Sequence, residues 1–333
     1  MSLEVAVAAA MFAGVIAYAV LGGADFGSGF FDLTAGSSRR GAELRTLVDH
    51  SIGPVWEANH VWLIYVLVIW WTGFPESFAA TMSTLVVPLL LALLGIVLRG
   101  ASFAFRKYSA TLRQARLFGV IFAVSSVITP FFLGTVAGAI ASGRVPMEED
   151  GDRWSSWLNP TSLFGGAIAV GTCAFLAGVF LAADAHRSRR SRLAEDLRAR
   201  SLGVGLVTGA LVFAALVPIS MDAPVLADGL AGRAAPLVVM AGLAGVATLV
   251  LVWRRRYSMA RWPAVVAVAS VVSGWGVAQY PWLLVDHVTI RAAAGASATL
   301  QGLLVAVGLA VVLVLPPLIY LLRLTQTEEW TRH

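Results

Sequence analysis

Charged side chains stand inside or at the ends of strongly apolar runs in the first third of the chain. The acids are Asp25 and Glu57, and the bases are Arg99 and Arg106. An ionised side chain in a bilayer costs roughly 2.5–3.5 kcal/mol on insertion scales, so such residues usually face a protein interior, pair with one another and serve a function. The sequence therefore predicts a proton-transfer site at Glu57, with Asp25 and Arg99 as supporting charges.

The balance of two opposing effects makes proton transfer plausible chemistry for Glu57. A neighbouring arginine favours the charged form of a carboxyl group, whereas desolvation favours the neutral form. We expect Asp25, Glu57, Arg99 and Arg106 to converge on the cytoplasmic third of the membrane, with Glu57 next to Arg99. A purely structural ion pair of Arg99 with Asp25 or Glu57 is the alternative. Arg106 stands beside Lys107, which favours an interfacial position with its charged end in water.

Membrane helices must position these residues, because hydrophobic residues make up 58% of the chain and charged residues only 13%. We predict an all-α integral membrane protein with a single polytopic domain over 1–333. A spanning helix needs about 20 mostly apolar residues. The sequence contains about nine such segments, the first read as a retained helix and not a signal peptide: 4–33, 51–72, 77–104, 115–142, 161–184, 200–221, 233–253, 262–281 and 298–322.

The helices fall into two candidate four-helix units, 1–142 and 161–281, followed by a ninth helix at 298–322. The first and fifth segments both end near an Ala-Asp pair, Ala24-Asp25 and Ala183-Asp184. A structural repeat and an unrelated succession of helices are both compatible with this pattern. Abundant glycine within the segments predicts close approach of the helices.

Lysine and arginine gather in the first, third, fifth and seventh loops, for example at Arg39, Arg106, Arg187 and Arg254. Positively charged loops stay in the cytoplasm. We therefore expect the N-terminus outside and the C-terminus in the cytoplasm of a bacterial cytoplasmic membrane. Because the basic residues lie in these short loops, the net charge of +5 does not indicate a nucleic-acid-binding protein.

Other polar and reactive residues offer less chemistry. The single cysteine, Cys173, reads as a small packing residue, and the spacing of the histidines and cysteines predicts no metal site. His60 could ligate a haem iron or relay a proton, although a lone histidine on a helix is more often a hydrogen-bonded packing residue. No strand precedes Gly27-Ser28-Gly29, so it does not form a nucleotide-binding loop.

Several motifs in the first third are similar to those of subunit II of the cytochrome bd-type quinol oxidases. They are Gly23-Ala24-Asp25-Phe26-Gly27-Ser28-Gly29, Pro54-Val55-Trp56-Glu57-Ala58-Asn59-His60-Val61-Trp62-Leu63, Gly73-Phe74-Pro75, and Leu98-Arg99-Gly100-Ala101-Ser102-Phe103-Ala104-Phe105-Arg106. Within the second motif, Trp56, Asn59 and Trp62 read as packing residues. The remaining two thirds resemble the family mainly in helix number, in size and in Tyr280-Pro281.

The resemblance implies a nine-helix subunit paired with a subunit I that oxidises quinol and carries the ligands of two b-type haems and one d-type haem. It implies that Glu57 occupies the family's membrane carboxylate on a proton route from the cytoplasm. It leaves open a structural quinone on this chain and a small accessory membrane subunit. The chain departs from the family pattern at Gly22 and Ala104, where acids are common, and at His60, where Glu or Gln is usual.

The function predicted from the sequence is that of the subunit that scaffolds subunit I and conducts protons inward. One alternative is a secondary transporter, whose substrate would bind near mid-membrane at interrupted helices. The other is a membrane scaffold without a proton role. The clustering of charge towards one side of the membrane favours the oxidase subunit over the transporter.

Overall fold

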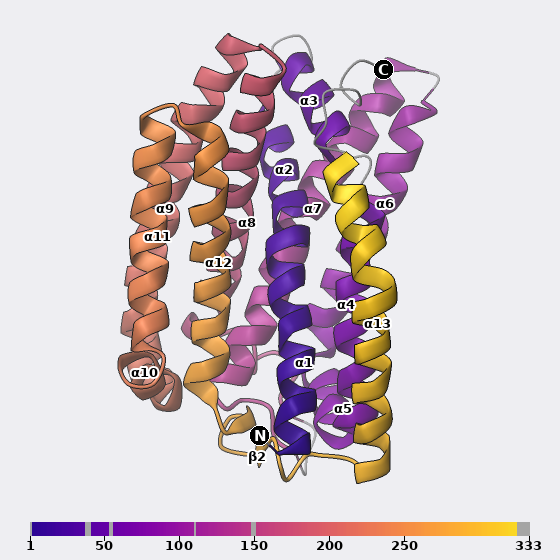
Figure 1. Cartoon of the computed structure of the whole chain (residues 1–333), viewed down its shortest axis with the longest axis vertical. Helices are drawn as coiled ribbons and strands as arrows, with labels where there is room; N and C mark the ends of the chain where they lie inside the picture. The colour runs from indigo at the N-terminus through magenta and orange to yellow at the C-terminus, as the bar shows by residue number, and fades with distance from the viewer. Residues whose placement is uncertain (1, 37–40, 53–55, 110, 148–150, 325–333) are drawn as a thin grey trace.

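The computed structural model describes residues 2–36, 41–52, 56–109, 111–147 and 151–324. In this part of the chain, eight helices are long and apolar enough to cross a membrane, or nine if the bent pair α4 and α5 forms one span. A helix pairs its backbone N–H and C=O groups internally, which lipid requires of a spanning segment. The prediction of an all-α integral membrane protein is confirmed, and Figure 1 shows the long helices side by side.

The spanning helices follow the predicted segments closely. The first span combines three elements, α1 (Leu3–Ala17), the π-helix η1 (Tyr18–Gly22) and α2 (Gly23–Leu33). Seven further helices span singly: α6 (Val86–Lys107), α7 (Leu112–Ala141), α8 (Pro160–Arg187), α9 (Ser191–Asp222), α11 (Ala235–Trp253), α12 (Tyr257–Gln279) and α13 (Ser297–Leu324). Helix α4 (Trp56–Gly73) belongs to the bent pair.

Two predicted segments are divided in the structure. The segment 77–104 is split into α5 (Pro75–Thr84) and α6, and the axes of α4 and α5 differ by 118°. Pro88 explains the split at Leu85, because a proline ring clashes with the carbonyl group four residues earlier, here that of Thr84. The segment 51–72 was also wrong at its start, since a separate helix, α3 (Ala42–Ile52), precedes α4.

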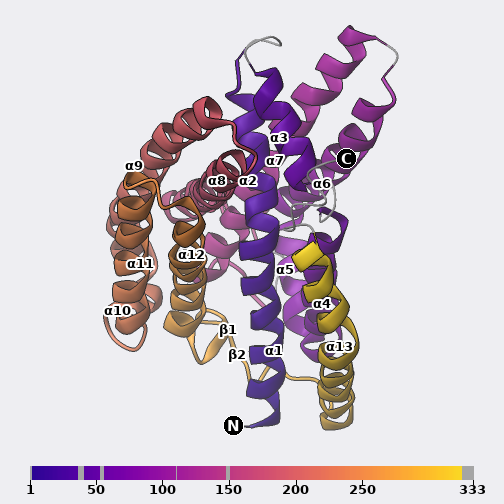
Figure 2. The same cartoon turned by 45° about the horizontal axis from the view of Figure 1, so that its top comes forward.

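Short elements close the two ends of the bundle. Helix α3 lies at one end, which we call the α3 end. At the opposite end, α10 (Pro224–Ala231) joins α9 to α11, and the strand β1 (Trp282–Leu284) pairs antiparallel with β2 (Val288–Thr289). Figures 1 and 2 show α13 at the edge of the bundle, where it packs against α1 and α4.

Helix α2 is held between α7 and α8 by residues with small side chains. A Cβ atom on Gly27 would overlap the carbonyl oxygen of Cys173 on α8, and one on Gly29 would overlap the side chain of Ser126 on α7. Gly134 and Gly165 make a similar contact between α7 and α8. The prediction that glycine permits close approach is confirmed. Gly27-Ser28-Gly29 is therefore a helix-packing motif.

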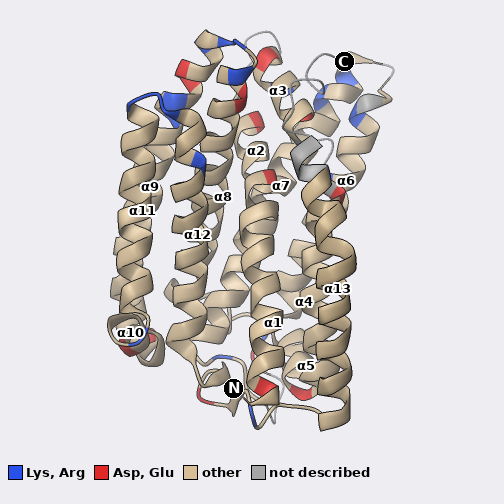
Figure 3. Ribbon diagram, in the orientation of Figure 1, with Lys and Arg blue, Asp and Glu red and all other residues tan. Residues whose placement is uncertain are grey.

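Charge is distributed unequally between the two ends. Figure 3 shows lysine and arginine concentrated at the α3 end, where the loops between α8 and α9 and between α11 and α12 lie. This is the separation that the arginine pattern predicts. The middle of the bundle is almost free of visible charge, which makes the few charged residues within it conspicuous.

Candidate functional site

The buried charges of the bundle centre on an ion pair between Asp25 and Arg99. Asp25 lies in the first turn of α2, and Arg99 lies on α6. Arg99 Nη2 donates to Asp25 Oδ1 at 2.6 Å, and the two side chains are 1% and 2% exposed. Arg99 Nε also donates to Ser126 Oγ at 2.9 Å. The structure thus selects Asp25 from the two predicted partners of Arg99.

The surroundings of this pair are apolar and aromatic. The guanidinium carbon of Arg99 lies 4.9 Å from the ring centre of Phe26 and 5.0 Å from that of Phe122, which are cation–π distances. Asp25 Oδ2 is buried and accepts no hydrogen bond from the protein groups that the structure describes. Breaking a buried pair by removing one partner costs about 3–5 kcal/mol, because a charge then remains uncompensated. The pair stabilises the junction of α2, α6 and α7.

A second carboxylate, Asp32, lies seven residues after Asp25 and so on the same face of α2. Asp32 Oδ1 accepts from Arg45 Nε at 2.7 Å, and Asp32 Oδ2 accepts from Arg106 Nη1 at 2.8 Å. Arg106 also pairs with Asp49 at 3.4 Å and is 15% exposed. The prediction of Arg106 as a residue that extends its charge into water is therefore wrong, because two acids hold it. The seven-residue spacing of the two aspartates is the signal that could have identified Asp32.

Glu57 lies in the first turn of α4. Its side chain is exposed on this chain. In the described part of the chain no ion pair joins Glu57 to Arg99, so the expected contact between them is absent. Glu57 belongs to a stripe of exposed residues on α4 whose other members are apolar: Val61, Ile64, Val68 and Trp71.

His60 lies one turn after Glu57 and contacts the first span. Its Nδ1 atom is 3.4 Å from the Tyr18 hydroxyl oxygen. The His60 ring packs edge-on against Phe26, with ring centres 5.8 Å apart. These contacts agree with the expected hydrogen-bonded packing role, and they also place His60 one aromatic ring away from Arg99.

The other motif residues of α4 contribute to packing. Asn59 is buried, and Trp62 packs against Tyr65 with ring centres 6.0 Å apart. Tyr65 donates from its hydroxyl group to the Ala10 carbonyl oxygen at 3.0 Å, which joins α4 to α1. The predicted packing role of Trp56 lies outside what the structure describes, because only its backbone is included.

Asp184 on α8 forms a separate charged cluster near the α3 end. It pairs with Arg261 and with Arg187, the latter at 2.5 Å, and accepts from Ser51 Oγ at 2.9 Å. Ser51 is on α3, so the cluster joins α3, α8 and α12. Asp184 is a structural anchor because its contacts hold these three helices together.

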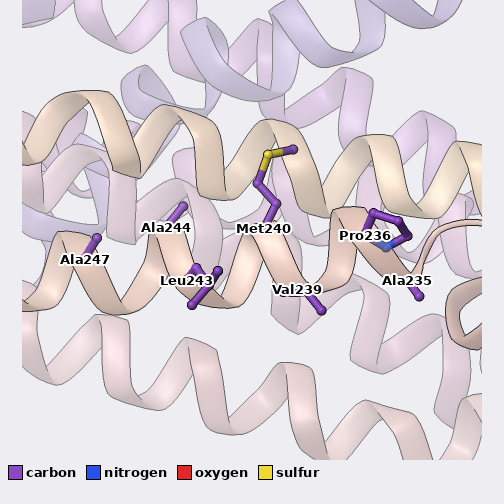
Figure 4. Close-up of a pocket in the computed structure, with 7 residues that line it drawn as sticks. All are labelled: Ala235, Pro236, Val239, Met240, Leu243, Ala244 and Ala247. Atoms are coloured by element: carbon purple, nitrogen blue, oxygen red, sulfur yellow. The ribbon is translucent and has the colours of Figure 1, made fainter.

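The described residues show little that could hold a cofactor on this chain. They contain no group of three or more His, Cys, Asp or Glu side chains that could hold a metal ion. Figure 4 shows a shallow hollow on α11 formed by apolar residues, which are Ala235, Pro236, Val239, Met240, Leu243, Ala244 and Ala247. None of these side chains could orient the polar headgroup of a quinone.

Comparison with known proteins gives consistent matches. The chain is 28% identical over 210 residues to the cytochrome bd ubiquinol oxidase subunit 2 of Bacillus subtilis, covering 62% of this chain and 60% of that protein. It is 29% identical over 164 residues to the cytochrome bd-I ubiquinol oxidase subunit 2 of Escherichia coli K12, covering 47% and 42%. These alignments thus span about half the length of the two relatives.

The similarity extends to the whole fold. A structure of bd oxidase from Geobacillus thermodenitrificans superposes with a TM-score of 0.80 and 25% identity, covering 98% of this chain and 99% of that one. The family model for cytochrome bd terminal oxidase subunit II matches residues 3–325. The match includes Asp25, Glu57 and Arg99, and the chain therefore belongs to the cytochrome bd terminal oxidase subunit II family.

Proposed function

We propose that this chain is the second subunit of a bd-type quinol:oxygen oxidoreductase in a bacterial cytoplasmic membrane. It pairs with a subunit I that carries two b-type haems and one d-type haem and oxidises quinol. The match of the family model over nearly the whole chain carries this proposal. The haems supply the redox chemistry, and this chain supplies position and electrostatics.

The contacts of His60 support placing the haem ligands on the partner. His60 packs against Phe26 and has the Tyr18 hydroxyl at its Nδ1 atom. A haem ligand needs a ring nitrogen directed at an open coordination site. The contacts with Tyr18 and Phe26 give His60 a packing role, and the family resemblance assigns the haem ligands to the partner.

The exposed stripe of α4 supports the pairing of two subunits. An ionised glutamate side chain that faces lipid is energetically unfavourable. Glu57 nevertheless stands on the same helix face as Val61, Ile64 and Val68, which are 48% to 59% exposed. A partner subunit that covers this face would bury the apolar side chains and bring Glu57 into the interior of the complex.

The proton route of the proposal enters from the α3 end and passes through Glu57, with Asp25 and Arg99 as supporting charges. Asp25 precedes the end of α2 at Leu33 by eight residues, about 12 Å of helix. Its Oδ2 atom accepts no hydrogen bond from the described protein groups, and in this proposal it is the atom that takes up a proton. The basic loops at the α3 end favour the cytoplasm for that end, with the N-terminus outside.

The alternative functions receive less support. A transporter would be expected to carry paired broken helices around a site at mid-membrane. The described residues contain one pair bent by more than 40°, α4 and α5, and its break lies at the end away from α3. A scaffold without a proton role would give no reason for an acid on the open face of α4.

The Glu57→Gln variant of the assembled complex tests the proton route. The change keeps size and hydrogen-bonding capacity, so haem content should survive. Oxygen consumption per haem should fall by about two orders of magnitude, the lower end of what acid–base catalysis contributes. Glu57→Asp should retain part of the activity. Wild-type turnover of Glu57→Gln would overturn the proton route.

The same measurement separates a structural role of Glu57 from a functional one. If Glu57 only stabilised the complex, haem content and oxygen consumption would fall together, and turnover per remaining haem would stay constant. Isolation of this chain with its partner should also give the absorption bands of b-type and d-type haems. A complex that lacks haem would contradict the assignment to an oxidase.

A further inference from the structure

The contact between Tyr18 and His60 lies at the junction of the first span and α4. Tyr18 is the first residue of η1, the π-helical stretch that interrupts the first span. Single π-helical turns within α-helices occur frequently at functional sites. The Tyr18 hydroxyl lies 3.4 Å from His60 Nδ1, so the irregular turn presents a polar group to the histidine.

Gly22 allows this position of the Tyr18 ring. A Cβ atom at residue 22 would lie 2.9 Å from both Cδ2 and Cε2 of Tyr18, closer than carbon atoms normally pack. The Tyr18 ring therefore lies along η1 over Gly22, towards α2. A side chain at residue 22 would displace the ring and with it the hydroxyl group that reaches His60.

The aromatic pair adjoins the buried ion pair. The ring of Phe26 lies perpendicular to that of Tyr18 at 6.1 Å and packs edge-on against that of His60 at 5.8 Å. The guanidinium carbon of Arg99 lies 4.9 Å from the ring centre of Phe26. A single ring thus separates Tyr18 and His60 from Asp25 and Arg99.

Glu57 lies on the same helix as His60, one turn before it. Glu57 and His60 are three residues apart on α4, which makes them neighbours on the helix surface. The other charged or titratable groups around His60 and Tyr18 are Asp25 on α2, Arg99 on α6 and Cys173 on α8.

We propose that His60 is a further proton-transfer residue between Glu57 and the buried Asp25, with Tyr18 as the positioning residue that orients its ring. The inference rests on the proposed proton route. A proton leaves the Glu57 carboxyl group and binds an imidazole nitrogen of His60, which leaves a carboxylate and an imidazolium. The imidazolium then gives a proton to the Asp25 carboxylate and returns to neutral imidazole, and Glu57 takes up another proton from the α3 end. No electron moves in these steps.

The test measures oxygen consumption per haem in the assembled complex between pH 5 and 9. His60→Gln retains a hydrogen-bonding side chain but cannot form a cation. We expect haem content to survive and turnover to fall about tenfold or more. The pH profile should also flatten between pH 5 and 8, the range in which histidine changes charge. A merely packed histidine would leave the shape of this profile unchanged.

Tyr18→Phe and Tyr65→Phe form a matched pair. Each removes one hydroxyl group that joins α4 to the first span, but only the Tyr18 hydroxyl contacts His60. Tyr18→Phe should lower turnover severalfold and shift the pH profile. Tyr65→Phe should leave both as in the wild type. Equal effects of the two variants would show that the Tyr18 contact is structural and would overturn the proposal.

Glu57→Gln separates failure of this inference from failure of the proton route. If Glu57→Gln loses turnover while His60→Gln keeps the wild-type rate and pH profile, the route stands and His60 is excluded from it. If both variants keep wild-type turnover, the route itself is wrong. Should His60→Gln lose haem, the Tyr18→Phe profile decides, and a wild-type profile there overturns the role of His60.

Discussion

Asp25 and Asp184 follow an alanine in the same dipeptide, on two helices that lie side by side and run in the same direction, yet their surroundings differ. Asp25 pairs with one arginine, is 2% exposed and has one oxygen without a partner. Asp184 is 19% exposed and is held by Arg187, Arg261 and Ser51. The Asp25 carboxylate is thus deeply buried with one donor residue, whereas the Asp184 carboxylate is partly exposed with three donor residues.

The number of donors determines what each carboxylate can do. Hydrogen bonds from charged donors are shorter and stronger than those between neutral groups, and Asp184 has two arginine donors and one serine donor. Asp184 is thereby fixed as an anchor for α3, α8 and α12. Asp25 has one arginine partner, and its Oδ2 atom accepts no hydrogen bond from the described protein groups. The same dipeptide therefore serves packing in one helix and, in our proposal, proton transfer in the other.

The largest effect is expected from breaking the ion pair between Asp25 and Arg99. Arg99→Met leaves the Asp25 carboxylate buried without its counter-charge and should destabilise the complex by about 3–5 kcal/mol. The yield of haem-loaded complex and its resistance to heat in detergent measure this loss. The double variant Asp25→Asn with Arg99→Met removes both charges and should recover most of the stability.

The double variant also separates stability from proton transfer. If Asp25 supports the route, the recovered complex should still turn over slowly per haem, because the asparagine side chain that replaces Asp25 cannot take up a proton. Wild-type turnover in the double variant would mean that the buried pair serves only to hold α2 against α6. Asp25 and Asp184 would then both be structural residues that differ only in burial.

A smaller effect should come from the contact that holds the two helices together. Gly27→Ala would place a methyl group against the Cys173 carbonyl oxygen and push α2 away from α8. Overpacking of this kind costs about 1–3 kcal/mol. In the described structure a Cβ atom on Gly209 of α9 meets no atom within 4 Å, so Gly209→Ala is the matched control. Equal melting temperatures of the two variants would contradict the close packing of α2 on α8.

The sequence predicted the spanning helices well because their signal is local. Long apolar runs bounded by arginine or proline determine where a helix crosses a membrane, and all nine predicted segments correspond to helices in the structure. The split at Leu85 was missed although Pro88 was visible. The hydropathy of an apolar segment stays high even where a proline forces the chain to bend, so hydropathy alone does not show the bend.

The site was harder to predict because the rotation of one helix about its axis relative to another is set by packing. Two ion pairs of Arg99 were expected, and the structure contains the one with Asp25. The ion pair of Arg106 with Asp32 was not predicted. The position of Glu57 on the open face of α4 could not be read from its spacing. Gly22 and His60 appeared as two unrelated departures from the family pattern, yet the ring of Tyr18 lies over the first and its hydroxyl contacts the second.

The smallest effect is expected from the removal of the Asp184 charge. Asp184→Asn keeps an acceptor for Ser51 but removes the charge that faces Arg261, which is 13% exposed. The loss should be about 1–2 kcal/mol, less than for Arg99→Met, because water partly screens the cluster. Asp196→Asn, which breaks an ion pair with Arg200 at a half-exposed carboxylate, should cost about 0.5 kcal/mol or less and serves as the control. Turnover per haem should equal that of the wild type in both variants, since neither lies on the proposed route. A selective fall in turnover of Asp184→Asn would show that a fully partnered carboxylate can also serve proton transfer, and the distinction drawn from the number of donors would fail.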